Sequence, residues 1–215
     1  METFFVLIVS WLHLQRIMKE KILETASEMF LKLGFKSVTM DDIANELGMS
    51  KKTIYVHFPN KSKLVESTAI YVFNQISEGI DFICGLKKNP IEEIYDIKNF
   101  VKDHLKDEKS SPQYQLQKYY PKTFKTLKRK QYDLMSGCVV DNLKRGIDLG
   151  LYRKSINLNF IARLYFNNIN NLKDEDLFPV KDFSSKNELM ENYLEYHLRG
   201  ICTQKGLKKL EEILN

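Results

Sequence analysis

Apolar residues recur every three to four positions along most of this chain, which is the period of an amphipathic α-helix. A first apolar face begins after Met18 and closes before Gly34, a residue that can end a helix in a left-handed cap. No segment shows the convincing alternation of a β-strand. The pattern therefore predicts an all-α fold, and its first helical face comprises Ile22, Ala26, Met29, Phe30 and Leu33.

Two short helices are predicted next, with a turn at residues 48–50 between them. Thr39 or Ser37 can cap the first of these helices, and Ser50 can cap the second over residues 51–57. Such caps satisfy backbone N–H groups that have no partner within the helix. The segment therefore reads as a compact helical pair.

Three residues of this pair have the spacing of a helix-turn-helix. Ala44 is small and lets two helices cross closely, Gly48 accepts the positive φ of a short turn, and Ile54 packs the second helix onto the core. A fourth helix opens at Lys61, after the break marked by Pro59.

The rest of the chain predicts longer helices separated by breaks. The sequence "KKNP" interrupts the pattern once, and residues 106–115 are the most loop-like stretch. The expected helical segments are 67–86, 91–105, one or two helices within 114–146, and two amphipathic stripes through 161–172 and 189–201, the last ending at Gly200 or Gly206.

Composition and charge narrow the class of protein. The chain has 215 residues, of which 43% are hydrophobic, and only nine glycines and five prolines, which indicates a packed globular protein. The net charge of +5 does not by itself imply nucleic acid. However, four lysines fall within residues 48–64, where no carboxylate occurs: Lys51, Lys52, Lys61 and Lys63.

The basic helical pair predicts contact with DNA. The second helix of a helix-turn-helix fits the major groove of B-DNA, while neighbouring helices contact phosphates. A charge run alone is explained as well by a solvated hairpin, but its combination with the helix-turn-helix spacing favours DNA. The candidate DNA-binding residues are Thr39, Ser50, Lys51, Lys52, Thr53, Tyr55, His57 and Lys61.

The segment from Ile22 to Leu64 resembles the DNA-binding domain of TetR-family transcriptional regulators. It departs from the family pattern at Lys52, where a small residue is common, and this change affects base preference or adds a phosphate contact. The matching positions are Ala26, Phe30, Gly34, Phe35, Thr39, Ile43, Ala44, Gly48, Ser50, Tyr55, Phe58, Lys61 and Leu64.

The resemblance implies two domains with different functions and a mechanism of regulation. Residues 18–64 are expected to bind double-stranded DNA, and residues 65–215 to form a larger helical domain for dimerisation and ligand binding. The last two long helices would pair with those of a second copy in a four-helix interface. A small-molecule effector would then pivot the fourth helix and release a homodimeric repressor from a palindromic operator.

Aromatic residues crowd the middle of the larger domain and suggest an effector pocket for a mainly apolar ligand with a few polar atoms. Core packing explains the same residues without a ligand. The candidate ligand-binding residues are Tyr95, Phe100, Tyr119, Phe124, Tyr132, Met135, Phe160 and Tyr165.

Residues 1–17 form an atypical apolar extension. Their apolar run from Phe4 to Leu14 is shorter than the ~20 residues that span a bilayer and lacks the features of a secretory signal. Three interpretations stay open: an extra packed helix, a membrane-surface anchor, or a segment translated upstream of a working start at Met18. We expect no stable membrane association.

Catalytic and metal chemistry find little support. The four histidines show no metal-binding spacing, no nucleophile elbow or phosphate loop occurs, and residues 173–176 ("KDED") are better explained as a solvated acidic loop than as a metal site. Neither an enzyme nor a cofactor is therefore expected. A helical adaptor that uses the helix-turn-helix for protein contacts is the remaining alternative.

Three scattered cysteines, Cys84, Cys138 and Cys202, form no CxxC pair. This usage is typical of buried thiols in a reducing compartment and favours a cytoplasmic protein. A redox or metal role is the alternative.

Overall fold

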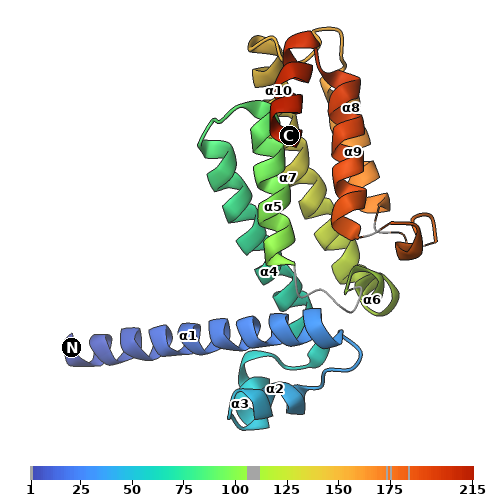
Figure 1. The fold of residues 1–215 in the computed structure, drawn as a ribbon. Helices are drawn as coiled ribbons and strands as arrows, with labels where there is room; N and C mark the ends of the chain where they lie inside the picture. The colour runs from blue at the N-terminus through green and yellow to red at the C-terminus, as the bar shows by residue number, and fades with distance from the viewer. Residues whose placement is uncertain (1, 106–111, 173, 175, 184) are drawn as a thin grey trace. The chain divides into compact units, whose positions relative to one another are not determined.

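A computed structural model describes the chain except for residues 1, 106–111, 173, 175 and 184 (Figure 1). Each named element among the described residues is a helix, which confirms the all-α prediction. The elements are α1 (Glu2–Leu33), α2 (Met40–Glu46), α3 (Lys51–His57), α4 (Lys61–Gly85), α5 (Pro90–His104), α6 (Pro112–Tyr119), α7 (Pro121–Asp148), α8 (Leu158–Asn171), the 3-10 turn η1 (Val180–Asp182), α9 (Lys186–Ile201) and α10 (Gln204–Leu214).

The helices form two compact units. The first unit comprises Met1–Ile76 and His104–Lys128, and the second comprises Ser77–Asp103 and Arg129–Asn215. Helices α4 and α7 each contribute residues to both units, so each unit contains segments that are distant in sequence.

The core of the first unit gathers the apolar faces of α1 to α4. Ile22, Ala26 and Phe30 of α1 are almost completely buried, as are Ile54 of α3 and Leu64 of α4. Burial of large apolar side chains is the main favourable term in folding. The predicted apolar face of α1 is therefore confirmed at Ile22, Ala26 and Phe30, but it is wrong at Leu33, which is 53% exposed.

Local signals end and begin these helices as the sequence predicts. Gly34 ends α1 with a φ of +87°, a conformation that costs glycine little. A Cβ at this position would also lie 2.5 Å from the side chain of Gln115 in α6, within the same unit. The left-handed backbone conformation is thus what requires glycine here, since the nearest atoms belong to the flexible end of the Gln115 side chain.

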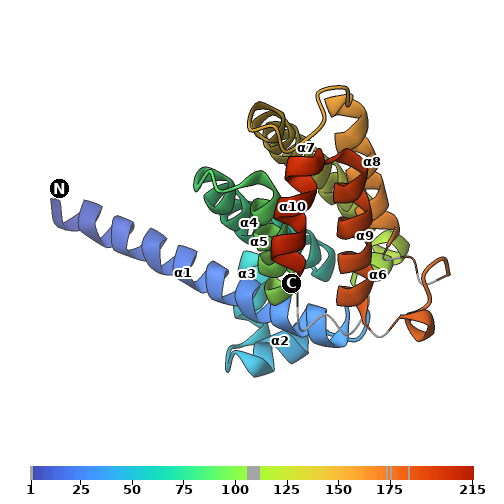
Figure 2. The ribbon, with the colours of Figure 1, turned by 45° about the horizontal axis from the view of Figure 1, so that its top comes forward.

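Helix α1 begins much earlier than predicted. The sequence places its start near Met18, whereas the structure continues the helix back to Glu2, so that its N-terminal half extends beyond α2 and α3 (Figures 1 and 2). No proline or glycine interrupts residues 2–17, and an ion pair of 3.0 Å between Arg16 and Glu20 bridges the predicted boundary.

The described side chains of this extension are largely exposed. Trp11, Leu12 and Leu14 each keep more than half of their surface accessible, which gives no support to the interpretation as an extra packed helix. None of the helices in the described part of the chain is long and apolar enough to cross a membrane.

The second unit contains helices α5 and α8 to α10, with parts of α4 and α7. Helices α8 and α9 run side by side in both views (Figures 1 and 2). The predicted end of α9 lies close to its actual end at Ile201, but a further helix, α10, follows. Gly206 does not end a helix, since it lies in the first turn of α10. A Cβ there would lie 2.2 Å from the carbonyl oxygen of Leu151. Its role is close packing.

Residues 106–115 are only partly described. The expected loop at 106–111 lies outside the described residues, whereas Pro112 to Gln115 form the first turn of α6. Proline is well suited to a first helical turn, because it lacks only an N–H group that would have no partner there. The loop prediction is therefore wrong for these four residues.

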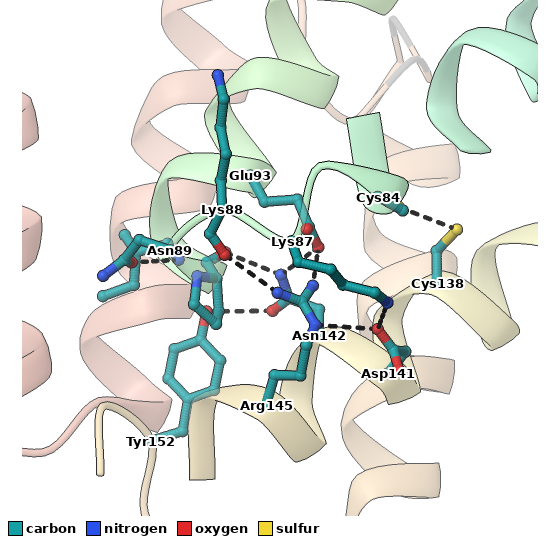
Figure 3. Close-up of polar contacts among 12 residues, drawn as sticks. Cys84, Lys87, Lys88, Asn89, Glu93, Cys138, Asp141, Asn142, Arg145 and Tyr152 are labelled. Atoms are coloured by element: carbon teal, nitrogen blue, oxygen red, sulfur yellow. Dashed lines mark hydrogen bonds and ion pairs between the residues drawn. The ribbon is translucent and has the colours of Figure 1, made fainter. Parts of the chain in front are cut away.

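A polar cluster lies inside the second unit (Figure 3). Glu93 of α5 is completely buried and pairs with Arg145 of α7. The side-chain amide of Asn142 donates to the Glu93 carboxylate at 2.9 Å and to the carbonyl oxygen of Pro90 at 2.8 Å, and the Tyr152 hydroxyl donates to Asn142 at 3.2 Å. Buried charges need such partners, so this cluster fixes α5 against α7.

The cluster gives a first prediction. Replacing Arg145 with leucine leaves the Glu93 carboxylate buried without its cation, and we expect a loss of about 3 kcal/mol in the free energy of unfolding in urea. Arg199→Leu is the matched control, because Arg199 pairs with Glu195 at the surface and should cost less than about 1 kcal/mol. Equal losses for the two variants would contradict the role of the buried pair.

The exposed extension gives a second prediction. Deleting residues 1–17 should leave the melting temperature nearly unchanged, because the described side chains of this stretch do not pack on the core. Deleting through Ile22 should lower it by several degrees, since Ile22 is fully buried. Thermal unfolding followed by circular dichroism checks both, and a large loss on the shorter deletion would show that the extension packs.

Candidate nucleic-acid interface

The start of α2 is fixed by a capping box. The Thr39 hydroxyl accepts a hydrogen bond of 3.1 Å from the backbone N–H of Asp42, and the Asp42 carboxylate accepts one of 2.8 Å from the backbone N–H of Thr39. The bond from the Thr39 backbone N–H, and a second bond of 2.8 Å that the Thr39 hydroxyl donates to the same carboxylate, lower the pKa of Asp42. The carboxylate therefore stays charged beside the helix N-terminus. Of the two predicted caps, the structure selects Thr39 and not Ser37.

The turn between α2 and α3 has the predicted geometry. Gly48 adopts a φ of +61°, and the backbone N–H of Met49 donates to the carbonyl oxygen of Ala44 at 2.9 Å. The Ser50 hydroxyl then caps α3 by accepting from the backbone N–H of Thr53 at 3.1 Å. The helix-turn-helix pattern is therefore confirmed in its backbone as well as in its spacing.

Helix α3 is held by one face and displays the other. Ile54 is completely buried, whereas Lys51, Lys52, Tyr55 and Val56 are exposed. Because α3 has seven residues, burial of Ile54 directs the exposed side chains away from the core. This outer face has donors and apolar atoms of the kinds that contact base edges.

Two of the predicted lysines have partners within the protein. The Lys51 ammonium lies 2.8 Å from a carboxylate oxygen of Asp41, and this contact raises the pKa of Lys51. The Lys61 ammonium donates to the carbonyl oxygen of Lys36 at 3.3 Å, and burial lowers the pKa of Lys61. Each lysine would have to share or exchange these contacts to bind a phosphate.

His57 lies at the end of α3 and is half-buried. Burial, and then the nearby charge of Lys19, lower the pKa of His57. The imidazole is therefore neutral near pH 7 and offers one donor and one acceptor instead of a charge.

Sequence reasoning missed Val56, which is 70% exposed on the displayed face of α3. An apolar side chain so exposed on a seven-residue helix is available for contact with a thymine methyl group. The signal was present in the sequence, because Val56 lies two positions after the inward residue Ile54 and therefore cannot share its face.

The candidate ligand residues are not gathered in one unit. Tyr119 and Phe124 belong to the first unit, and the other six belong to the second. Tyr119 and Phe160 are exposed, by 42% and 61% respectively. Tyr132 packs edge-on against Phe166, with ring centroids 5.2 Å apart. Their role in ligand binding stays a prediction.

A better-defined polar feature is the hydroxyl of Tyr95. It is buried and has no hydrogen-bond partner among the described residues. Burial also raises the pKa of Tyr95. A buried hydroxyl without a partner is unfavourable, and a ligand atom could satisfy it.

A shallow depression lies along the outer side of α7. Its volume is about 490 Å³, and its lining contains charged and apolar groups from a single helix. The lining residues are Tyr132, Asp133, Ser136, Gly137, Val140, Asp141 and Lys144.

The described residues contain no group of three or more histidine, cysteine, aspartate or glutamate side chains that could hold a metal ion. Of the acidic stretch at 173–176, Lys173 and Glu175 lie outside the described residues.

Helix α6 contacts the core formed by α1 to α4 within the first unit. The side-chain oxygen of Gln115 accepts from the backbone N–H of Lys36 at 3.2 Å, and Leu116 is buried in the same core as Phe35. The rings of Phe35 and Tyr120 lie 6.1 Å apart. A change in α6 would therefore be felt directly by the segment that leads into α2.

Helices α8 and α9 leave large apolar side chains exposed. Phe160 and Leu164 of α8 are 61% and 38% exposed, and Tyr196 of α9 is 77% exposed. Exposed apolar groups on adjacent helices are typical of a surface that another molecule covers.

Comparison with known proteins places the helical pair in a family. Residues 22–68 match the family described as "Bacterial regulatory proteins, tetR family". The chain is 42% identical over 53 residues to the uncharacterized HTH-type transcriptional regulator YerO of Bacillus subtilis. This match covers 25% of this chain and 18% of YerO. It is 32% identical over 66 residues to the IcaR negative regulator of the biofilm operon icaADBC of Staphylococcus epidermidis, covering 31% of this chain and 34% of IcaR. This chain thus spans about a third or less of the length of these two relatives.

Solved structures share the fold over most of the chain. The repressor SmeT of the Stenotrophomonas maltophilia multidrug efflux pump SmeDEF aligns with a TM-score of 0.65 and 15% identity, covering 86% of this chain and 91% of SmeT. A TetR-family regulator from Agrobacterium tumefaciens aligns with a TM-score of 0.70 and 17% identity, covering 88% and 100%. The predicted resemblance is confirmed: the chain carries the N-terminal domain of the tetR family of bacterial regulatory proteins and has the fold of TetR-family regulators.

Proposed function

We propose that this chain is a sequence-specific transcriptional repressor that binds a palindromic operator as a homodimer and leaves DNA when a small molecule binds. The observation that carries the proposal is the outer face of α3, where Lys52, Tyr55 and Val56 are exposed on a helix anchored by Ile54. IcaR is named a negative regulator and SmeT a repressor, which favours repression.

In this proposal residues 18–64 bind double-stranded DNA. Thr53, Tyr55 and Val56 face base edges, and Lys52 binds a phosphate. Lys51 and Lys61 give up part of their internal contacts to bind further phosphates. Thr39 and Ser50 position the two helix starts, whose backbone N–H groups face the DNA backbone.

Residues 65–215 bind the effector and the second copy. The exposed residues of α8 and α9, Phe160, Leu164 and Tyr196, supply an apolar surface that two copies can bury together. One of the solved structures with this fold is a complex of SmeT with triclosan, a relative that holds a small organic molecule. An effector of this class, mainly apolar with a few polar atoms, suits the aromatic interior of the second unit.

Release follows if the effector favours a conformation that binds DNA poorly. An effector shifts this equilibrium only as far as its affinity differs between the two conformations. Helix α4 begins beside α3 and contributes to both units, and α6 contacts the segment before α2, so both can transmit the shift. We place the protein in the cytoplasm, where its DNA would be.

A helical adaptor that uses α3 for protein contacts is the alternative function. It would not require lysines on the displayed face. Catalysis is not part of the proposal, since the named relatives are transcriptional regulators.

The third prediction tests DNA binding. The full-length protein should retard a fragment of its own upstream region in a gel at low salt, with two chains per site. Tyr55→Ala should weaken binding by about tenfold. Lys52→Ala should reduce the slope of log affinity against log salt by about 1, which is the change expected for the loss of one phosphate contact.

Lys208→Ala is the matched control for Lys52→Ala, because Lys208 is an exposed lysine on α10 in the other unit. It should leave the affinity and the salt slope close to those of the unmodified protein. If no fragment of the upstream region is retarded, the repressor proposal fails, and the adaptor alternative gains support.

The fourth prediction tests the effector site. Replacing Tyr95 with phenylalanine removes a buried hydroxyl without a partner, so the free energy of unfolding should change by less than about 1 kcal/mol. If that hydroxyl bonds the effector, release of DNA by apolar compounds such as triclosan should require several-fold more compound. Tyr114→Phe, at an exposed site, is the control. Unchanged release for Tyr95→Phe would exclude this hydroxyl from the effector site.

A further inference from the structure

Two cysteines that are far apart in sequence lie next to each other in the second unit. The sulfur atoms of Cys84 and Cys138 are 3.5 Å apart, although the two residues are 54 positions apart in the chain (Figure 3). Cys84 lies in the last turn of α4, and Cys138 lies within α7. The expectation of separate buried thiols is wrong for these two cysteines, because both are half-buried and in contact.

Independent contacts hold the two thiols in place. Three positions further along the chain from each cysteine, Lys87, which follows the end of α4, pairs with Asp141 of α7 at 3.2 Å. Arg145 donates to the carbonyl oxygen of Lys88 at 3.1 Å and also pairs with Asp141 at 3.0 Å. The end of α4 is therefore fixed on α7 by contacts that do not involve sulfur.

The distance between the sulfurs is close to van der Waals contact. A disulfide requires a separation of about 2.05 Å, which small adjustments of the two side chains can reach from this position. Both thiols are half-buried, so a small reagent can reach the sulfur atoms more easily than a large reductant can.

The two thiols differ in their readiness to react. The Cys84 thiol donates a hydrogen bond to the Cys138 sulfur, which lowers the pKa of Cys138 and raises that of Cys84. The nearby carboxylates of Asp81, Glu93 and Asp141 act against the lowering at Cys138. Because the thiolate is the reactive form, Cys138 is the first nucleophile and Cys84 the resolving thiol.

We propose that Cys84 and Cys138 are an oxidation site at which a hydroperoxide forms an intramolecular disulfide between α4 and α7. The Cys138 thiolate attacks the terminal oxygen of the hydroperoxide, the O–O bond breaks, and an alcohol leaves after taking up a proton. The Cys84 sulfur then attacks the resulting sulfenic acid, the S–O bond breaks, and water leaves with the remaining proton. Two thiols lose two electrons in total, and the hydroperoxide is reduced to alcohol and water.

The disulfide would restrict the helix that connects the site to the DNA-facing segment. Helix α4 runs without interruption from Lys61, beside α3, to Gly85, directly after Cys84. Oxidation adds a covalent bond at its far end, where the reduced protein has only ion pairs and hydrogen bonds, which can rearrange when DNA binds. This second step rests on the proposed function, and we expect it to lower the affinity for DNA by about tenfold, a usual size for coupling between two sites.

The experiment starts from reduced full-length protein treated with tert-butyl hydroperoxide. Free thiols counted under denaturing conditions should fall from three per chain to one, and dithiothreitol should restore them. Peptide mass mapping should find Cys84 joined to Cys138 within one chain. Cys138→Ser should prevent the disulfide, and Cys202→Ala should still lose two thiols, since Cys202 is buried elsewhere in the second unit.

Three free thiols after treatment, or a disulfide that joins two chains or includes Cys202, would overturn the oxidation site. Gel retardation of the upstream fragment by oxidised and reduced protein tests the second step, and equal affinities with the disulfide formed would overturn that step. If the reduced protein retards no DNA, the proposed function fails, whereas the thiol count still decides the oxidation site independently.

Discussion

Helices of seven residues are not stable by themselves in water, and this constraint governs the first unit. Both α2 and α3 have that length, so each depends on caps at its ends and on apolar contacts with longer helices. Helix α1 provides the contacts through Ile22, Ala26 and Phe30, all almost completely buried. The orientation of α3, and with it any contact to DNA, therefore depends on a core built mainly by another helix.

The second unit depends on a buried polar cluster instead. Its helices are longer and need less local support, but a completely buried carboxylate, Glu93, must keep its partners Arg145 and Asn142. Such a cluster contributes less to stability than to a single arrangement of α5 on α7, because any other arrangement leaves a charge unpaired. Gly146 serves the same arrangement, since a Cβ there would lie 2.0 Å from the ring of Tyr152.

Features set by neighbours in sequence were predictable, and features set by distant residues were not. The caps at Thr39 and Ser50 and the positive φ at Gly34 and Gly48 follow from local chemistry. The start of α1 was missed because the prediction required amphipathicity, whereas uninterrupted helix-forming residues are enough for the helix to continue.

Long-range contacts explain the other misses. Nothing in the local sequence indicates that Cys84 meets Cys138, that Lys51 pairs with Asp41 across the turn, or that Gly206 packs against Leu151. The candidate ligand residues were chosen because aromatics crowd one stretch of sequence. Since α7 contributes to both units, neighbours in that stretch end up in different cores.

The separation between what holds α3 and what it displays has an evolutionary consequence. Substitutions at exposed positions away from special features usually change stability by less than about 0.5 kcal/mol. Lys52, Tyr55 and Val56 are such positions, whereas Ile54 between them is not. In the proposed function, a lineage can therefore acquire new operator preferences by drift at the exposed positions while the fold stays intact. Duplicated copies of such a gene can then diverge in their targets without first finding compensating mutations in the core.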